Sequence, residues 1–166
     1  LDSGLTGLKE ASLAFISATA ESSENSRIGV ATFNAYGNNL SNLVNARDNK
    51  NSLKQTIASI YAAGGTSPQK GLSIAQTNLA NSKRTDVPQY VILFTDGAPS
   101  EDTDKNDSKE IARQLRESGI TVYTVGLKLN DETSNWLSEN IASTNCAFTA
   151  ANVDELKVIF AKIQQT

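Results

Sequence analysis

The sequence predicts an α/β domain built around a mainly parallel sheet. Residues 90–94 read Tyr-Val-Ile-Leu-Phe, a continuous apolar run typical of a strand that is buried on both faces. Segments of this character alternate along the chain with segments of helical periodicity, which is the pattern of an α/β fold. A length of 166 residues suits one domain, so we expect residues 1–166 to form a single unit.

Strands are expected on both sides of this central run. The turn-forming stretch Asn34–Asn39, in which Gly37 is available for a positive φ, separates two short apolar segments. It predicts an antiparallel hairpin at the edge of the sheet. The further expected strands are Ile28–Phe33, Leu40–Val44, Ile120–Val125 and a short one around Phe148.

Helices are predicted from apolar periodicity and from the residues at their ends. Gly64 and Gly65 end one helix, Ser67 caps the next, and Pro68 fits its first turn. Gly119 is the expected stop of a later helix. The expected helices cover residues 5–20, 51 or 52 to about 62, 67 to about 79, 108–117, 131–140, and 152 or 153 to 163.

The stretch Ser100–Asp107 is rich in carboxylates, which can bind Ca²⁺. It lacks the glycine and the terminal glutamate at the spacing of an EF-hand loop. We therefore expect a solvated loop that leads into the helix starting at Ser108.

Composition excludes several classes of function. The net charge of −3 and the pI of about 5.0 argue against nucleic acid as the main partner. The absence of histidine removes Ser-His and Cys-His catalysis and histidine-based zinc sites.

The single cysteine, Cys146, excludes an internal disulfide, and we expect it to pack as a small apolar residue near the last strand. No apolar stretch approaches the roughly 18 residues of a membrane span. The chain has no methionine and begins at Leu1, so we expect a piece of something longer.

Two short motifs mark a candidate site. Asp96 follows the central run in Thr-Asp-Gly, where a carboxylate would stand at the strand's carboxyl end, the edge at which α/β sheets bind ligands. Thr66 follows two glycines and precedes a helix. Each motif alone is as often a structural turn or cap as a site. Together they predict a hydroxyl and a carboxylate at one sheet edge, which suits Mg²⁺, Mn²⁺ or Ca²⁺. A single carboxylate leaves the metal's charge undercompensated, so the site would attract an acidic group from a partner.

The order of these motifs resembles the von Willebrand factor type A domain, the family related to the integrin inserted domain. The resemblance covers almost the whole chain. It implies a Rossmann-like doubly wound sheet with helices on both faces and a metal-ion-dependent adhesion site at one edge, where Thr66 and Asp96 would hold the metal. The matching stretches are Ile-Gly-Val-Ala-Thr-Phe-Asn from Ile28, Gly-Gly-Thr-Ser from Gly64, Val-Ile-Leu-Phe-Thr-Asp-Gly from Val91, Glu-Ser-Gly-Ile from Glu117, Thr-Val-Tyr-Thr-Val-Gly from Thr121, and the helix beginning Val-Asp-Glu-Leu at Val153.

The chain departs from the family at its beginning. The family's site starts with Asp-x-Ser-x-Ser at the end of a first apolar strand, and the chain has neither. Leu1 to Gly4 have the wrong spacing, so we place Leu1 just after that motif. The first central strand and up to three metal ligands would then come from an upstream segment or from another chain. The alternative is a degenerate scaffolding domain without metal. A missing central strand would leave two neighbouring edges unpaired, so we expect something to fill its place.

The resemblance implies a protein-binding module, not an enzyme. The metal would take a carboxylate from a protein ligand, and tight binding would accompany a shift of the C-terminal helix. The hydroxyls of Thr66, Ser67 and Ser100 have no base placed by a motif, which argues against nucleophilic catalysis. Loops rich in Asn, Ser and Thr suit an extracellular or bacterial surface adhesin, for example a pilus protein that binds matrix or host-surface proteins. The alternative is an intracellular module that assists an AAA-type ATPase or chelatase. Tyr36, at the expected hairpin tip, is an exposed residue that would be available to a ligand.

Overall fold

The computed structural model describes residues 2–61, 66–82, 84, 86–95, 99 and 101–164, and the side chains from residue 5 onward. The described helices and strands alternate as expected. In chain order they are α1 (Asp2–Ser22), β1 (Arg27–Phe33), β2 (Gly37–Asn45), α2 (Lys50–Ala58), α3 (Pro68–Asn81), β3 (Tyr90–Thr95), α4 (Asp102–Glu117), β4 (Thr121–Leu127), α5 (Asp131–Asn140), β5 (Ala147–Ala150) and α6 (Val153–Gln164).

The strands form two sheets in the described part of the chain. β3, β4 and β5 form a parallel sheet in that order, with Val91 opposite Val122 and Val125 opposite Phe148. β1 and β2 form an antiparallel pair whose register shifts around Val30. The predicted α/β class, the mainly parallel sheet and the antiparallel hairpin are confirmed.

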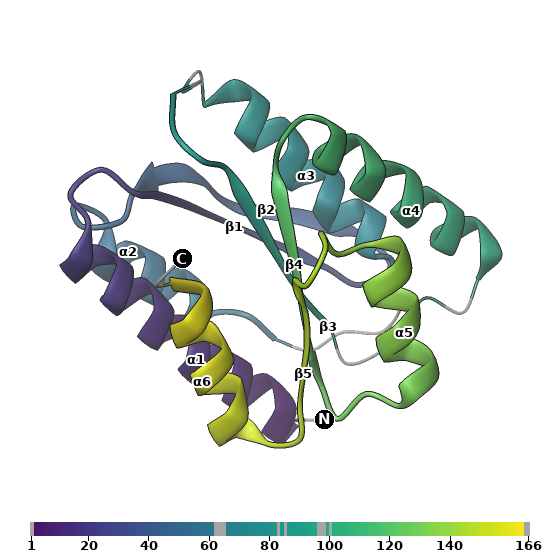
Figure 1. Cartoon of the computed structure of the whole chain (residues 1–166). Coiled ribbons are helices and arrows are strands. Elements are labelled where there is room, and N and C mark those ends of the chain that lie inside the picture. Colours follow the sequence, from purple (N-terminus) through teal and green to yellow (C-terminus); the bar gives the residue numbers. More distant parts are fainter. Residues whose placement is uncertain are drawn as a thin grey trace.

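Helices cover both faces of the strands (Figure 1). On one face, α3, α4 and α5 bury a core that includes Leu72, Leu115 and Ile141. On the other face, α1 and α6 pack on β4 and β5, and α1 and α2 pack on the hairpin. Burying each large aliphatic side chain contributes about 1.5–3 kcal/mol, so these cores are the main source of stability. Within the described residues, no helix is long and apolar enough to span a membrane.

Several predicted boundaries were wrong. α4 begins at Asp102, so most of the expected loop Ser100–Asp107 is helical. Its first turn carries Asp102 and Asp104, which the partial positive charge of a helix N-terminus stabilises. β4 continues through Gly126 to Leu127, because Gly126 still pairs with β3 and the Leu129 side chain occupies the space beside it.

The expected start of α2 at Asn51 or Ser52 was also wrong. The helix runs from Lys50 to Ala58, with Asn49 as its N-cap residue. The chain already turns at Asn45, whose carbonyl accepts a 3.1 Å hydrogen bond from the amide of Asn49. Helical hydrogen bonding therefore begins before the residues that look like caps in the sequence.

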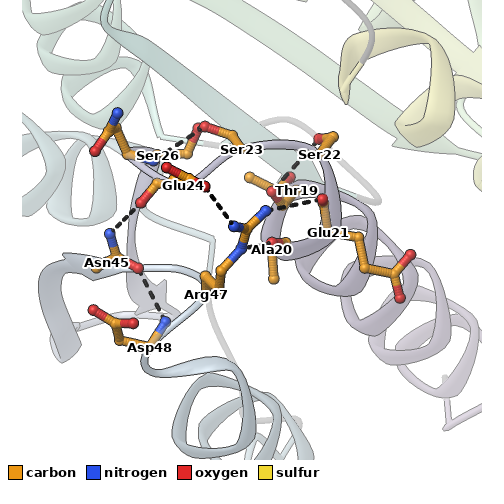
Figure 2. Close-up of polar contacts among 11 residues, drawn as sticks. Thr19, Ala20, Glu21, Ser22, Ser23, Glu24, Ser26, Asn45, Arg47 and Asp48 are labelled. Carbon is orange, nitrogen blue, oxygen red and sulfur yellow. Dashed lines mark hydrogen bonds and ion pairs between the residues drawn. The ribbon is translucent and has the colours of Figure 1, made fainter.

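The side chain of Arg47 connects the β1–β2 hairpin to the C-terminal end of α1 by hydrogen bonds (Figure 2). Arg47 follows β2, and its guanidinium donates to the carbonyls of Ala20 at 2.7 Å and Glu21 at 3.0 Å. It also forms a 3.5 Å ion pair with Glu24. The last carbonyls of a helix have no partner within the helix, so Arg47 caps α1 while tying the hairpin to it.

Candidate functional site

The turn that carries Thr66 is held against the tip of the β1–β2 hairpin. The amide of Ser67 donates a 2.9 Å hydrogen bond to the carbonyl of Asn34, the residue after β1. Two hydrogen bonds join Asn34 and Tyr36. The Asn34 amide donates to the Tyr36 carbonyl at 2.8 Å, and the Tyr36 amide donates to the side-chain oxygen of Asn34 at 2.7 Å. Thr66 is thereby placed beside the carboxyl end of β1, partly buried.

Thr66 shares a cavity with residues at the ends of two strands. Thr66, Phe33 at the end of β1 and Thr95 at the end of β3 all line one cavity. Asp96, Gly64 and Gly65 lie outside the described residues, so the expected pairing of Thr66 with Asp96 stays a prediction. The described neighbour of Asp96 is Thr95, which is buried at the carboxyl end of β3.

A polar network that the sequence did not reveal supports this turn. Ser67 was predicted as a helix cap, and it does occupy that position, but its side chain makes no capping bond. Its hydroxyl instead donates to Oδ2 of Asp104 at 3.3 Å. The Gln69 side-chain amide donates to Oδ1 of Asp104 and accepts a 3.2 Å bond from the Ser108 hydroxyl. Gln69 and Ser108 are buried, so this network joins α3 to the first turns of α4.

The side-chain oxygen atoms of the described residues suit only part of the coordination shell of a hard cation. The Thr66 hydroxyl is a suitable ligand, whereas the Ser67 hydroxyl is engaged with Asp104. Among the described residues there is no group of three or more His, Cys, Asp or Glu placed to hold a metal. A complete shell would therefore need Asp96 and further ligands from outside the described part of the chain.

Two exposed tyrosines are candidates for contact with a ligand. Tyr36 is 74% exposed, which confirms the expected exposure of the hairpin tip. Tyr61 is 82% exposed and precedes the turn in the chain. Its exposure was not predicted, because no sequence pattern distinguishes an exposed tyrosine in a loop from a packed one. Tyrosine is enriched in protein interfaces, and both side chains are exposed enough to contact a ligand.

A large cavity separates the two sheets. Its volume is about 890 Å³, and its walls come from β1, β3, α1, α3 and α6. We call it the inter-sheet slot. The central strand was expected to be buried on both faces, yet Ile92 and Phe94 are only partly buried, because this face of β3 borders the slot. Well-packed interiors hold few voids larger than a water molecule, so a cavity of this size is a notable feature of the fold.

Comparison with known proteins supports the sequence resemblance. Residues 2–162 match the model of the von Willebrand factor type A domain. The chain belongs to this family. A related sequence is the collagen alpha-4(VI) chain of Mus musculus, which is 29% identical over 110 residues. That match covers 63% of this chain but only 4% of the collagen chain, so the relative is far longer than the region it shares.

Solved structures share the fold of this type A domain. The vWF domain of the type V pili tip protein Mfa5 from Porphyromonas gingivalis superposes with a TM-score of 0.85 at 16% identity, covering 97% of this chain and 87% of that one. Proximal thread matrix protein 1 from the mussel byssus, solved with a zinc-occupied MIDAS motif, gives a TM-score of 0.72 at 22% identity, covering 94% and 39%. At these identities the likeness concerns the fold. The Rossmann-like architecture implied by the sequence is confirmed.

Proposed function

We propose that this type A domain is a protein-binding module that engages an acidic residue of a protein ligand through a metal ion at the Thr66 edge. The observation that supports the proposal is the bond from the Ser67 amide to the Asn34 carbonyl, beside Thr66, together with the cavity that Thr66 lines with Phe33 and Thr95. The occupied motif in the mussel protein supports a metal in a relative of this fold.

The proposed metal is Mg²⁺, with Mn²⁺ or Ca²⁺ able to replace it. The Thr66 hydroxyl and the Asp96 carboxylate would hold it, and residues outside the described part would complete the shell. Such an ion attracts a ligand carboxylate because its charge exceeds that of its protein ligands. In this proposal, the side chains of Ser67, Gln69 and Asp104 fix the turn that carries Thr66.

We further propose an extracellular or cell-surface setting, with an extracellular matrix or host-surface protein as the ligand. A collagen chain and a pilus tip protein are among the relatives, and both support an adhesive role over a catalytic one. The exposed side chains of Tyr36 and Tyr61 would supply apolar contacts around the ligand's acidic residue.

Manganese binding tests the proposal directly. We expect the polypeptide to bind Mn²⁺ in a titration followed by electron paramagnetic resonance. Thr66→Ala and Asp96→Ala should each weaken binding by at least about tenfold, since each removes an oxygen ligand. Thr103→Ala and Asp107→Ala, at exposed positions of α4, are matched controls that should bind as the unmodified protein does. Absence of binding at millimolar Mn²⁺, or equal binding by all variants, would refute the proposal and favour a metal-free scaffold.

A further inference from the structure

Lys128, the residue after β4, adopts a backbone conformation that is unusual for a lysine. Its φ is +56°, in the left-handed region. Glycine and asparagine enter this region most readily, whereas a long side chain meets steric repulsion there. Among the described residues other than glycine, only Asn145 has a positive φ as well. Residues held in such conformations are found most often at binding sites and active sites, so the outlier points to a role for the Lys128 side chain.

The residues around Lys128 hold this conformation. The Lys128 amide donates a 2.8 Å hydrogen bond to the carbonyl of Ala150, which continues the pairing of β4 with β5 beyond Leu127. On the other side, the Leu129 side chain occupies the space beside Gly126, where an added Cβ would clash with it. The backbone of Lys128 is therefore fixed from both directions, while its side chain is exposed.

Lys128 lies at the carboxyl edge of the parallel sheet (Figure 1). Gly126, two residues earlier, pairs with Thr95, the last residue of β3. Leu127 lines the inter-sheet slot together with Thr66 and Thr95. Strands lie about 4.8 Å apart and rise about 3.3 Å per residue, so the Lys128 backbone is on the order of 10 Å from the end of β3. About three residues of an extended peptide cover this distance.

The ammonium group of Lys128 is available to a partner. In the described part of the chain, Lys128 takes part in no ion pair and in no side-chain hydrogen bond. The acidic residues that follow it, Asp131 and Glu132, lie in the first turn of α5, where the partial positive charge of the helix N-terminus stabilises them. An exposed cation on a fixed backbone can select a partner by charge.

We propose that Lys128 is a specificity-determining residue of the Thr66 edge, and that the protein ligand presents two acidic side chains. One carboxylate binds the metal, and the second forms an ion pair with the Lys128 ammonium group. The fixed backbone limits where this group can lie, so only some spacings between the two acidic residues fit. This inference rests on the proposed function and narrows the ligand from a protein with one acidic residue to an acidic segment.

Synthetic peptides test this specificity on the full-length polypeptide in the presence of Mn²⁺. The probes are glycine–serine peptides with two aspartates at increasing spacing, each matched by a peptide in which asparagine replaces the second aspartate. At the best spacing, we expect the two-aspartate peptide to bind about three- to fivefold more tightly, the effect of one exposed ion pair. Added salt should reduce this preference, because it screens an exposed pair.

Two variants at position 128 separate the charge from the backbone. Lys128→Gln removes the charge and should bind the matched peptides equally. Lys128→Gly should also lose the preference, but its Tm should equal or exceed that of the unmodified protein, because glycine suits a positive φ. Asn145→Gly is the matched control, since Asn145 is exposed, also has a positive φ, and precedes β5 at the opposite edge of the sheet. Its Tm should not fall either, and it should keep the preference for two aspartates.

The outcomes distinguish this inference from the proposed function. Equal binding of the matched peptides by the unmodified protein, or a preference that survives in Lys128→Gln, would overturn the role of Lys128 and leave metal-dependent binding in place. A lower Tm for Lys128→Gly, measured without metal, would assign the lysine to the stability of the turn and would also overturn the proposal. If no peptide binds at millimolar concentration with Mn²⁺ present, the proposed function fails, and this inference fails with it.

Discussion

The amide of Ser67 lies 2.9 Å from the carbonyl oxygen of Asn34 and donates a hydrogen bond to it. This bond joins the turn before α3 to the tip of the hairpin, so the position of Thr66 depends on two segments that are distant in sequence. The Ser67 hydroxyl extends the link to Asp104 of α4. The candidate site is therefore supported from both sides of its turn.

Replacing Asp104 by alanine should destabilise the fold and loosen the Thr66 turn. The change removes the acceptor of two side-chain hydrogen bonds and leaves the buried Gln69 amide without that partner. We expect a loss of about 1–3 kcal/mol in the free energy of unfolding, measured by urea denaturation. Asp107→Ala, at an exposed position of the same helix, is the control and should change stability little. Equal stability of the two variants would show that the network contributes nothing.

Apolar pattern and end signals predicted most of the fold. α5 occupies residues 131–140 as expected, and Asn130 before it accepts a 2.8 Å hydrogen bond from the amide of Thr133. Gly119 after α4 has a φ of +84°, the conformation expected of a helix stop. These features depend on residues that are close together in the chain, so the sequence alone predicts them.

The features that the sequence did not predict depend on contacts between distant segments. Taken alone, the polar run from Glu101 to Asp107 resembles a loop. In the structure, Ser108 and Ala112 are buried against the core, and α4 extends toward the N-terminus to include Asp102. The role of Asp104 followed from that packing and had no local signal. For the site, the expected pairing of Thr66 with Asp96 stays a prediction, because Asp96 lies outside the described residues.

Arg47→Ala should loosen the attachment of the hairpin to α1. The substitution removes two bonds to the terminal carbonyls of α1 and the ion pair with Glu24. Because the side chain is partly exposed, we expect a modest loss of about 1 kcal/mol. Faster amide hydrogen exchange at the end of α1 would locate the effect. Arg113→Ala removes only exposed ion pairs on α4 and should leave stability nearly unchanged; an equal loss in both variants would contradict a capping role for Arg47.

Burial should shift the pH dependence of the Cys146 thiol's reactivity to higher pH. Burial raises the pKa of the Cys146 thiol, because a low-polarity environment disfavours the thiolate. At pH 8 we expect iodoacetamide to alkylate folded protein more slowly than protein unfolded in urea, with the pH of half-maximal rate higher in the folded state. Since the pKa is raised on folding, stability should decline as the pH rises from the unfolded pKa through the folded one. A folded profile at or below the unfolded one would contradict this.

Gly7→Ala tests how closely α1 and α6 approach. In an unobstructed helix, replacing glycine by alanine stabilises by about 1 kcal/mol. Here the added carbon would lie 2.4 Å from Cγ2 of Val153, so we expect destabilisation of about 1–3 kcal/mol in urea denaturation. Val153→Ala removes the opposing methyl groups, and the double variant should recover most of the loss, which gives a favourable coupling in a double-mutant cycle. Thr6→Ala, at an exposed position of α1, is the control. Additive effects would show that the cost of the new carbon does not come from a clash with Val153, and would contradict the close approach of α1 and α6 at this point.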